Sequence, residues 1–187
     1  LQHCGIFYME YEGVPFYFID NEHYFKRDNL YGYVDDGERF SYFCKAVLEA
    51  IKGTDFIPDI LHCNDWHTGM VMPLLEEHYS NDNHYNKIKR VFTMHNLQYQ
   101  GIFPVDLLET LNLGKNYFHP DALEFYGNIN FMKAGINYSN IITTVSETYS
   151  KEIQYPFYGE NLDGLLRYHK EKLYGITNGI DYQIYDP

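Results

Sequence analysis

The stretch Arg90-Val-Phe-Thr-Met-His-Asn-Leu-Gln-Tyr-Gln-Gly101 changes character halfway along its length. Its first part is a short run of β-branched and apolar residues, which is typical of a strand buried on both faces. The second part is rich in hydrogen-bonding side chains, namely His95, Asn96, Gln98, Tyr99 and Gln100. Ligands of open parallel sheets bind beyond the carboxyl ends of the strands, so this cluster predicts a site. The alternative is that His95 only stabilises a turn.

On both sides of this stretch, strand patterns alternate with helix patterns. The expected strands are residues 59–63, 89–94, 140–145 and 172–177, and the expected helices are residues 35–53, 68–79, 105–113, 129–138, 146–154 and 162–170. This alternation indicates an α/β fold with a Rossmann-like parallel sheet sandwiched by helices. Ahead of it, residues 5–12 and 14–20 predict a β-hairpin that turns at Glu12-Gly13, and residues 21–33 predict an extended loop.

Polar residues follow each expected strand of the parallel sheet. They are Asn64-Asp65-Trp66-His67, His95-Asn96, Ser146-Glu147 and Asn178-Gly179. Because the carboxyl ends of parallel strands meet at one edge, these four corners should line a single cleft. Asp65 could cap the following helix or contact a ligand, whereas a role in the turn is favoured for His67. Ser146 is expected to be an N-cap.

Composition limits the classes of partner. Hydrophobic residues make up 45% of the 187 residues, which is enough for the core of one domain. The net charge of −12 argues against nucleic-acid binding through a broad surface. No leader sequence and no apolar run of membrane-spanning length is seen, so neither secretion nor a membrane location finds support.

The remaining expectations concern the cysteines, a possible metal site, Lys133 and the aromatic residues. Three widely spaced cysteines indicate reduced thiols in a cytoplasmic protein. Cys63, His62 and His67 lack the partners that would complete a tetrahedral set, so no metal site is expected.

Lys133, alone on an apolar helix, should pair with a carboxylate or meet a phosphate. Twenty tyrosines and thirteen phenylalanines could serve as platforms for sugar rings, although α/β cores use aromatic residues too.

Eight short runs are spread over nearly the whole chain. They are Phe18-Ile-Asp-Asn-Glu22, Asp35-Asp-Gly-Glu-Arg-Phe40, His62-Cys-Asn-Asp-Trp-His67, Phe92 to Gly101, Phe131-Met-Lys-Ala-Gly135, Ile142-Thr-Thr-Val-Ser146, Tyr158-Gly-Glu160 with Leu162-Asp-Gly-Leu-Leu166, and Gly175-Ile-Thr-Asn-Gly-Ile-Asp181. In this order the runs resemble the N-terminal domain of bacterial glycogen synthases and plant starch synthases. These enzymes are glucosyltransferases of the two-domain GT-B fold.

The resemblance implies transfer of glucose from ADP-glucose to the non-reducing end of an α-1,4-glucan. It implies retention of anomeric configuration, and neither a metal nor another cofactor. At matching positions it implies two catalytic residues: His95 resembles the histidine that contacts the donor glucose, and Asp65 the active-site aspartate. Substrate-binding residues are expected to be Asn178, in the donor pocket, together with Asn96, Tyr99, Gln100, Trp66 and His67.

The sequence also departs from the family pattern. The family's Lys-x-Gly-Gly loop and its C-terminal nucleotide-binding domain, with phosphate-binding Arg and Lys, are absent, and Glu147 stands where proline is usual. Residues 1–187 are therefore expected to be a partial N-terminal domain that is too acidic to hold ADP alone and is inactive alone. Two alternatives stay open, namely a GT-B transferase that uses UDP-glucose and a non-catalytic glucan-binding module.

Overall fold

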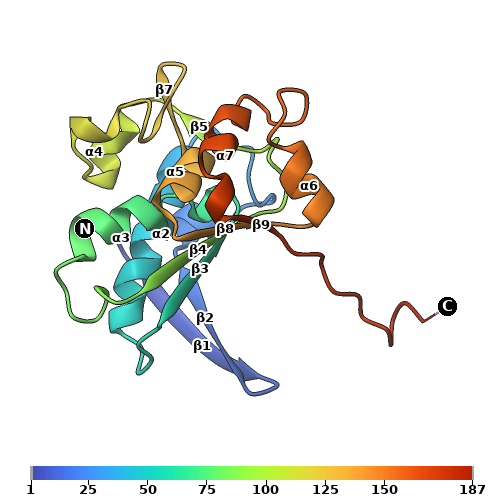
Figure 1. The fold of residues 1–187 in the computed structure, drawn as a ribbon. Helices are drawn as coiled ribbons and strands as arrows, with labels where there is room; N and C mark the ends of the chain where they lie inside the picture. Colours follow the sequence, from blue (N-terminus) through green and yellow to red (C-terminus); the bar gives the residue numbers. More distant parts are fainter. Residues whose placement is uncertain (1, 187) are drawn as a thin grey trace.

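The computed structural model describes residues 2–186, and its chain begins with a β-hairpin. Strand β1 (Gly5–Tyr11) pairs antiparallel with β2 (Val14–Asp20), and Tyr11 lies opposite Val14. The two turn residues, Glu12 and Gly13, both have positive φ, at 50° and 76°, which suits the twist of a tight hairpin. The expected hairpin is confirmed, and it projects from the body of the molecule (Figure 1).

A four-stranded parallel sheet forms the centre of the molecule. Its strands, in spatial order, are β3 (Ile60–Asn64), β4 (Lys89–Met94), β8 (Ile141–Thr144) and β9 (Leu173–Gly175). Every neighbouring pair in this sheet is parallel. The α/β class and the parallel sheet expected from the alternating patterns are therefore confirmed, with each strand within about two residues of its expected bounds.

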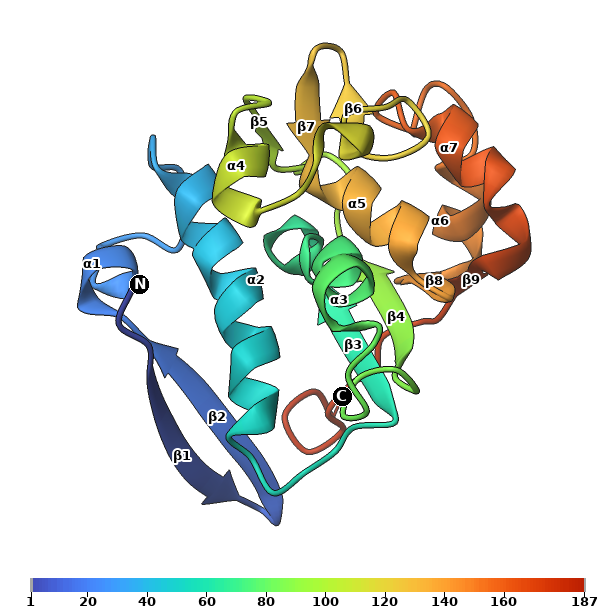
Figure 2. The same ribbon diagram turned by 90° about the vertical axis from the view of Figure 1, so that its left-hand side faces the viewer.

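Helices cover one side of this sheet. They are α2 (Asp36–Lys52), α3 (Val71–Tyr79), α4 (Leu107–Leu111), α5 (Phe131–Tyr138), α6 (Glu147–Glu152) and α7 (Asp163–Tyr168), with 3₁₀ turns at Trp66–Thr68, Lys115–Tyr117 and Lys170–Lys172. The strands follow one another across the sheet in chain order, so right-handed crossovers bring α3, α5 and α7 to the same side (Figures 1 and 2). The parallel sheet flanked by helices, as expected from the sequence, is thus confirmed.

Two expectations for the connecting segments differ from the structure. Residues 21–33 were expected to be extended, but they contain the short helix α1 (Glu22–Phe25), whose N-cap Asn21 accepts a hydrogen bond from the Tyr24 N–H. A second, antiparallel sheet was not foreseen. It consists of β5 (Ile102–Phe103), β6 (Glu124–Phe125) and β7 (Asn128–Asn130). Strands of two or three residues are too short to show a periodic pattern.

The packing of α5 against β4 depends on a glycine. A Cβ added at Gly135 would come within 2.4 Å of the ring of Phe92, which is fully buried in β4. Helix α5 can therefore approach the sheet closely only because position 135 has no side chain. Among residues 2–186, no helix is both long enough and apolar enough to cross a membrane.

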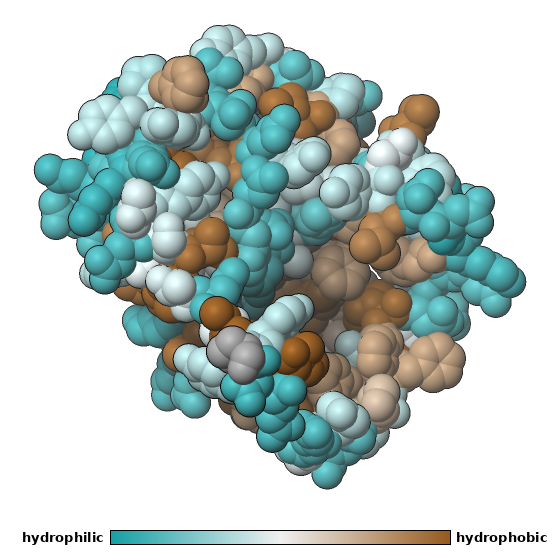
Figure 3. All heavy atoms as spheres, turned by 90° about the vertical axis from the view of Figure 1, so that its right-hand side faces the viewer, coloured by the Kyte–Doolittle hydropathy of each residue, from teal (hydrophilic) through white to brown (hydrophobic). Residues whose placement is uncertain are grey.

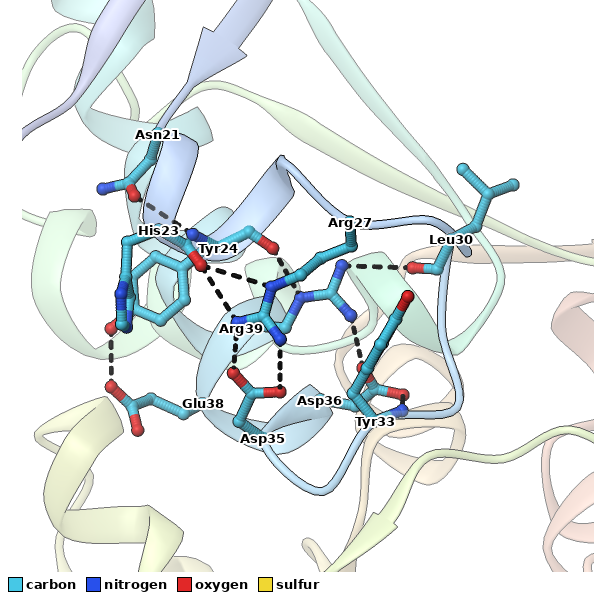
Figure 4. Close-up of polar contacts among 10 residues, drawn as sticks. All are labelled: Asn21, His23, Tyr24, Arg27, Leu30, Tyr33, Asp35, Asp36, Glu38 and Arg39. Carbon is cyan, nitrogen blue, oxygen red and sulfur yellow. Dashed lines mark hydrogen bonds and ion pairs between the residues drawn. The ribbon is translucent and has the colours of Figure 1, made fainter.

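Two arginine–aspartate pairs hold the loop that leads into α2 (Figure 4). Arg39 is 2% exposed and pairs with Asp36 at 2.5 Å, and it also donates to the carbonyls of Tyr24 and Leu30. Arg27 pairs with Asp35 at 2.6 Å in a more exposed position. The loop between these residues is thus tied to the first turn of α2.

We expect Gly135→Ala to lower the free energy of unfolding by about 1–3 kcal/mol, because the added methyl group overpacks the contact with Phe92. This loss should exceed the helix-propensity gain of about 1 kcal/mol. Gly164→Ala in α7 is the matched control, since its Cβ would meet only the end of the Arg167 side chain at 3.8 Å. Urea unfolding measures both, and equal stabilities of the two variants would contradict the packing argument.

Arg39→Met should destabilise the chain by about 3 kcal/mol, because it leaves the buried Asp36 carboxylate without its cation. Arg27→Met is the control, and it should cost at most about 1 kcal/mol because its ion pair is partly exposed to water. The difference between the two urea midpoints tests this ranking. A larger effect at Arg27 would show that the exposed pair holds the loop.

Candidate functional site

The segments after β3, β4 and β8, which carry three of the polar corners, begin at the same edge of the parallel sheet. Thr93, one residue before the end of β4, lies opposite Asn64, the last residue of β3. Met94 lies opposite Thr144, and Thr144 lies opposite Gly175, so these three strands end in register. The chain continues this register beyond β9, because the Ile176 N–H donates to the Thr144 carbonyl at 2.8 Å.

Asp65 joins the ends of β3 and β4. Its Oδ1 accepts a hydrogen bond from the backbone N–H of His95 at 2.8 Å, and its own N–H donates to the Thr93 carbonyl at 2.9 Å. Its backbone has φ 58° and ψ 174°, a region that glycine prefers and that costs other residues about 1–3 kcal/mol. The capping role is excluded, because the Asp65 side chain makes no cap hydrogen bond to the 3₁₀ turn that follows.

The imidazole of His95 is exposed at the carboxyl edge of the parallel sheet, which we call the rim. Its Nε2 is 3.0 Å from Oδ1 of Asn64, the residue before Asp65. The ring is therefore oriented by one side chain, while the backbone of the same residue is held by Asp65. Asn64 belongs to the first polar corner expected from the sequence, which assigned it no role of its own, and the alternation of side chains along β3 puts it on the opposite face from buried Cys63.

The buried side chain of Trp66 packs against His67 and Gly101. Its indole is 5% exposed, and the ring of His67 stacks on it with centroids 3.9 Å apart. Gly101, at φ 62°, packs so closely that a Cβ there would lie 2.3 Å from the indole. Trp66 is thus packed into the core, and its expected contact with substrate stays a prediction. His67 lies in the 3₁₀ turn Trp66–Thr68, and burial lowers the pKa of its imidazole.

Gln100 is buried, and both ends of its side-chain amide hydrogen-bond to other segments of the chain. It is 7% exposed, its Nε2 donates to the Glu160 carbonyl at 2.8 Å, and its Oε1 accepts from Asn130 at 2.6 Å. Both ends of the amide hydrogen-bond within the protein, and the expected direct binding role of Gln100 stays a prediction. Tyr99, which is 50% exposed, and Asn96, which is exposed, remain available to a ligand at the rim.

Tyr31 belongs to the rim but was missed from the sequence. Its ring centroid lies 5.2 Å from that of His67 and 6.2 Å from that of Tyr99. The loop clamped by Arg27 and Arg39 carries it there (Figure 4). No periodic pattern marks this loop, so only a search for isolated aromatic residues near an ion-pair cluster could have found it.

Asn178 lies farther along the chain than the other corners. It is exposed, and within residues 2–186 no hydrogen bond joins it to Asp65 or His95. The segment after β9 runs away from the body (Figure 1), and hydrophobic side chains surround a hollow on the face that carries it (Figure 3). The role of Asn178 in a donor pocket stays a prediction.

The remaining expectations concern metals and Lys133. Within the described part of the chain, no group of three or more His, Cys, Asp or Glu side chains could hold a metal ion, and the three cysteines are free. The Nζ of Lys133 donates to the carbonyls of Pro120 and Glu124 at 2.5 and 2.7 Å. Backbone carbonyls therefore take its protons, and among residues 2–186 no carboxylate forms the expected ion pair with Lys133.

Comparison with known proteins identifies the family. Residues 1–168 match the family described as the starch synthase catalytic domain. The chain is 59% identical over 186 residues to a glycogen synthase of Desulforamulus reducens and 57% identical over 187 residues to one of Anoxybacillus flavithermus. These alignments cover 99% and 100% of the chain, which spans 39% of the length of each relative.

A solved structure agrees with this assignment. The catalytic domain of Starch Synthase IV from Arabidopsis thaliana, bound to ADP and acarbose, superimposes with a TM-score of 0.89 at 37% identity. The match covers 96% of this chain and 38% of that one. With the parallel sheet and the Asp65–His95 rim in place, the chain belongs to the starch synthase catalytic domain family.

Proposed function

We propose that this chain is the N-terminal part of a glycogen or starch synthase. The enzyme would transfer glucose from ADP-glucose to the non-reducing end of an α-1,4-glucan and retain the anomeric configuration. The observation that carries the proposal is the rim at the carboxyl edge, where Asp65 holds the backbone of His95 and Asn64 orients its ring. The names of the relatives, and the ADP bound to the starch synthase of similar fold, support the choice of substrates.

In this proposal His95 is the catalytic residue that contacts the donor glucose. Glucosyl transfer develops positive charge on the sugar and negative charge on the departing diphosphate, so pre-positioned polar groups lower the barrier. Asp65 fixes the position of His95, and its backbone strain is of the kind that proteins retain at functional sites. Asn96, Tyr99 and Asn178 would contact the substrates.

The diphosphate needs cations from elsewhere in the enzyme. The corner segments, residues 64–68, 95–101, 145–147 and 176–178, contain no lysine or arginine. Arg27, in the adjacent loop, and Arg39, in the first turn of α2, are already paired with aspartates. We therefore infer that the remaining length of the relatives supplies the phosphate-binding charge, and that this chain alone does not transfer glucose. The free cysteines support a cytoplasmic location.

Glucose incorporation into glycogen tests the reaction. The chain at its natural length should incorporate label from ADP-glucose, and an α-1,4-specific glucosidase should release that label. Residues 1–187 alone should incorporate none. Label from UDP-glucose in preference to ADP-glucose would identify a different transferase. Binding of glycogen while ADP-glucose stays intact would identify a non-catalytic module instead.

His95→Ala at natural length should lower kcat by about 10²–10³-fold, as expected for the loss of one contact made in the transition state. His78→Ala, at an exposed histidine on α3, is the matched control and should leave kcat unchanged. Steady-state rates over a range of ADP-glucose concentrations separate kcat from KM. An unchanged kcat in His95→Ala would remove this residue from the chemistry.

A further inference from the structure

A strained loop lies beside the segment that follows β4. The loop, residues 158–161, connects α6 to α7 (Figure 1). Two consecutive residues in it, Glu160 and Asn161, have positive φ angles of 48° and 64°. Non-glycine residues adopt such angles infrequently, and they keep them only where surrounding contacts hold the backbone in place. Strain of this kind gathers at functional sites.

The loop is fixed to the core at Gly159 and Leu162. A Cβ added at Gly159 would come within 2.4 Å of the Cβ of Asp163 and 2.8 Å of the Ile153 carbonyl oxygen, so the chain passes through a space that suits only glycine. Leu162 is 2% exposed, and its N–H donates to the Gly159 carbonyl at 2.6 Å. The loop is therefore held in one place, with the side chain of Glu160 exposed.

The side-chain amide of Gln100 connects this loop to two other segments. Its Nε2 donates to the Glu160 carbonyl at 2.8 Å, and its Oε1 accepts from Asn130 Nδ2 at 2.6 Å. Asn130 is fully buried and is the N-cap of α5, where its Oδ1 accepts from the Lys133 N–H at 2.9 Å. One buried amide thus joins the rim segment, which we define as residues 95–101, to the loop and to the start of α5.

The rim segment has further hydrogen bonds to α5 and α6. The first two residues of α5 donate their N–H groups to the carbonyls of Gln100 and Gly101, at 2.9 and 3.0 Å. The Leu97 N–H donates to the Tyr149 hydroxyl on α6 at 3.3 Å, which is a long hydrogen bond. Among residues 2–186, in contrast, the rim segment hydrogen-bonds to the loop through the Gln100 side chain alone. A change of this one side chain should therefore uncouple the loop and leave the backbone contact with α5 in place.

We propose that Gln100 is a positioning residue, which couples the placement of the loop to that of the rim segment. His95, Asn96 and Tyr99 lie on this segment and are exposed, so a shift of its backbone would move all three. Gln100 would act on the reaction through these residues. That the coupling serves glucose transfer rests on the proposed function, whereas the coupling itself rests on the hydrogen bonds of the Gln100 amide.

Gln100→Met at the natural length of the chain tests the coupling, because methionine is of similar size and removes both amide hydrogen bonds. Amide hydrogen exchange, followed by mass spectrometry of peptides, should become faster in residues 95–101 and stay unchanged in α3, which excludes global unfolding. The kcat for glucose transfer from ADP-glucose should fall about tenfold, since small displacements of reacting groups are costly. Gln154→Met is the matched control, because its Nε2 also donates to a backbone carbonyl at 2.8 Å, that of Ser150, and both readouts should stay as in the unaltered chain.

A second pair of variants tests the loop side of the contact. The Glu160 carbonyl accepts the hydrogen bond, and the Glu160 side chain makes no hydrogen bond or ion pair within residues 2–186. Glu160→Gly should therefore preserve both exchange and kcat, because glycine adopts positive φ without strain. Glu160→Val should reproduce the effects of Gln100→Met, because a β-branched residue disfavours positive φ.

The outcomes separate this inference from the proposed function. Faster exchange in residues 95–101 together with the fall in kcat, in both Gln100→Met and Glu160→Val, supports the inference. If the unaltered chain transfers no glucose, faster exchange still supports the coupling, and the proposed function alone fails. Glucose transfer with an unchanged kcat in both variants would overturn the positioning role, whatever their urea midpoints, and leave the proposed function standing.

Discussion

The parallel hydrogen bonding of β4 to its two neighbours is the constraint on which the rest of the structure depends. β4 pairs with β3 on one side and with β8 on the other, and β9 extends the same register. Because all four strands point the same way, their carboxyl ends meet at one edge, and polar residues far apart in the chain become neighbours. Phe92, at the centre of β4, anchors this strand beneath α5, where Gly135 permits the close approach.

A strained backbone at Asp65 and side chains that hydrogen-bond to other parts of the protein hold the rim in place. Asp65 holds an unfavourable backbone conformation, and its carboxylate is directed to the His95 N–H. Gln100 ties the segment after His95 to Asn130 and to the Glu160 carbonyl. These contacts leave the His95 ring at the surface, where Asp65 holds its backbone and Asn64 its imidazole. Such fixed placement is what a group needs if it is to stabilise a transition state without reorganising.

The basic residues of this acidic chain are used internally. Arg39 binds Asp36 and two carbonyls, Lys133 binds two carbonyls, and Lys172 donates to the carbonyls of Ile136, Asn137 and Ser139. Burial accordingly lowers the pKa of Lys172 to about 8. These three cations are bound within the fold of a chain with a net charge of −12, and they have little positive charge to offer a diphosphate.

The sequence by itself determined the class of fold, the hairpin, the strands of the parallel sheet, the main helices and the edge at which His95 and Asp65 lie. Local patterns sufficed for these features, because the spacing of apolar residues reports which face of an element is buried. Only the tertiary structure decided that Trp66 and Gln100 are buried, that Lys133 binds carbonyls, and that Tyr31 lies beside His67 and Tyr99. A side chain's partners come from distant segments, and the polarity of a residue does not reveal whether the protein or a ligand will satisfy it.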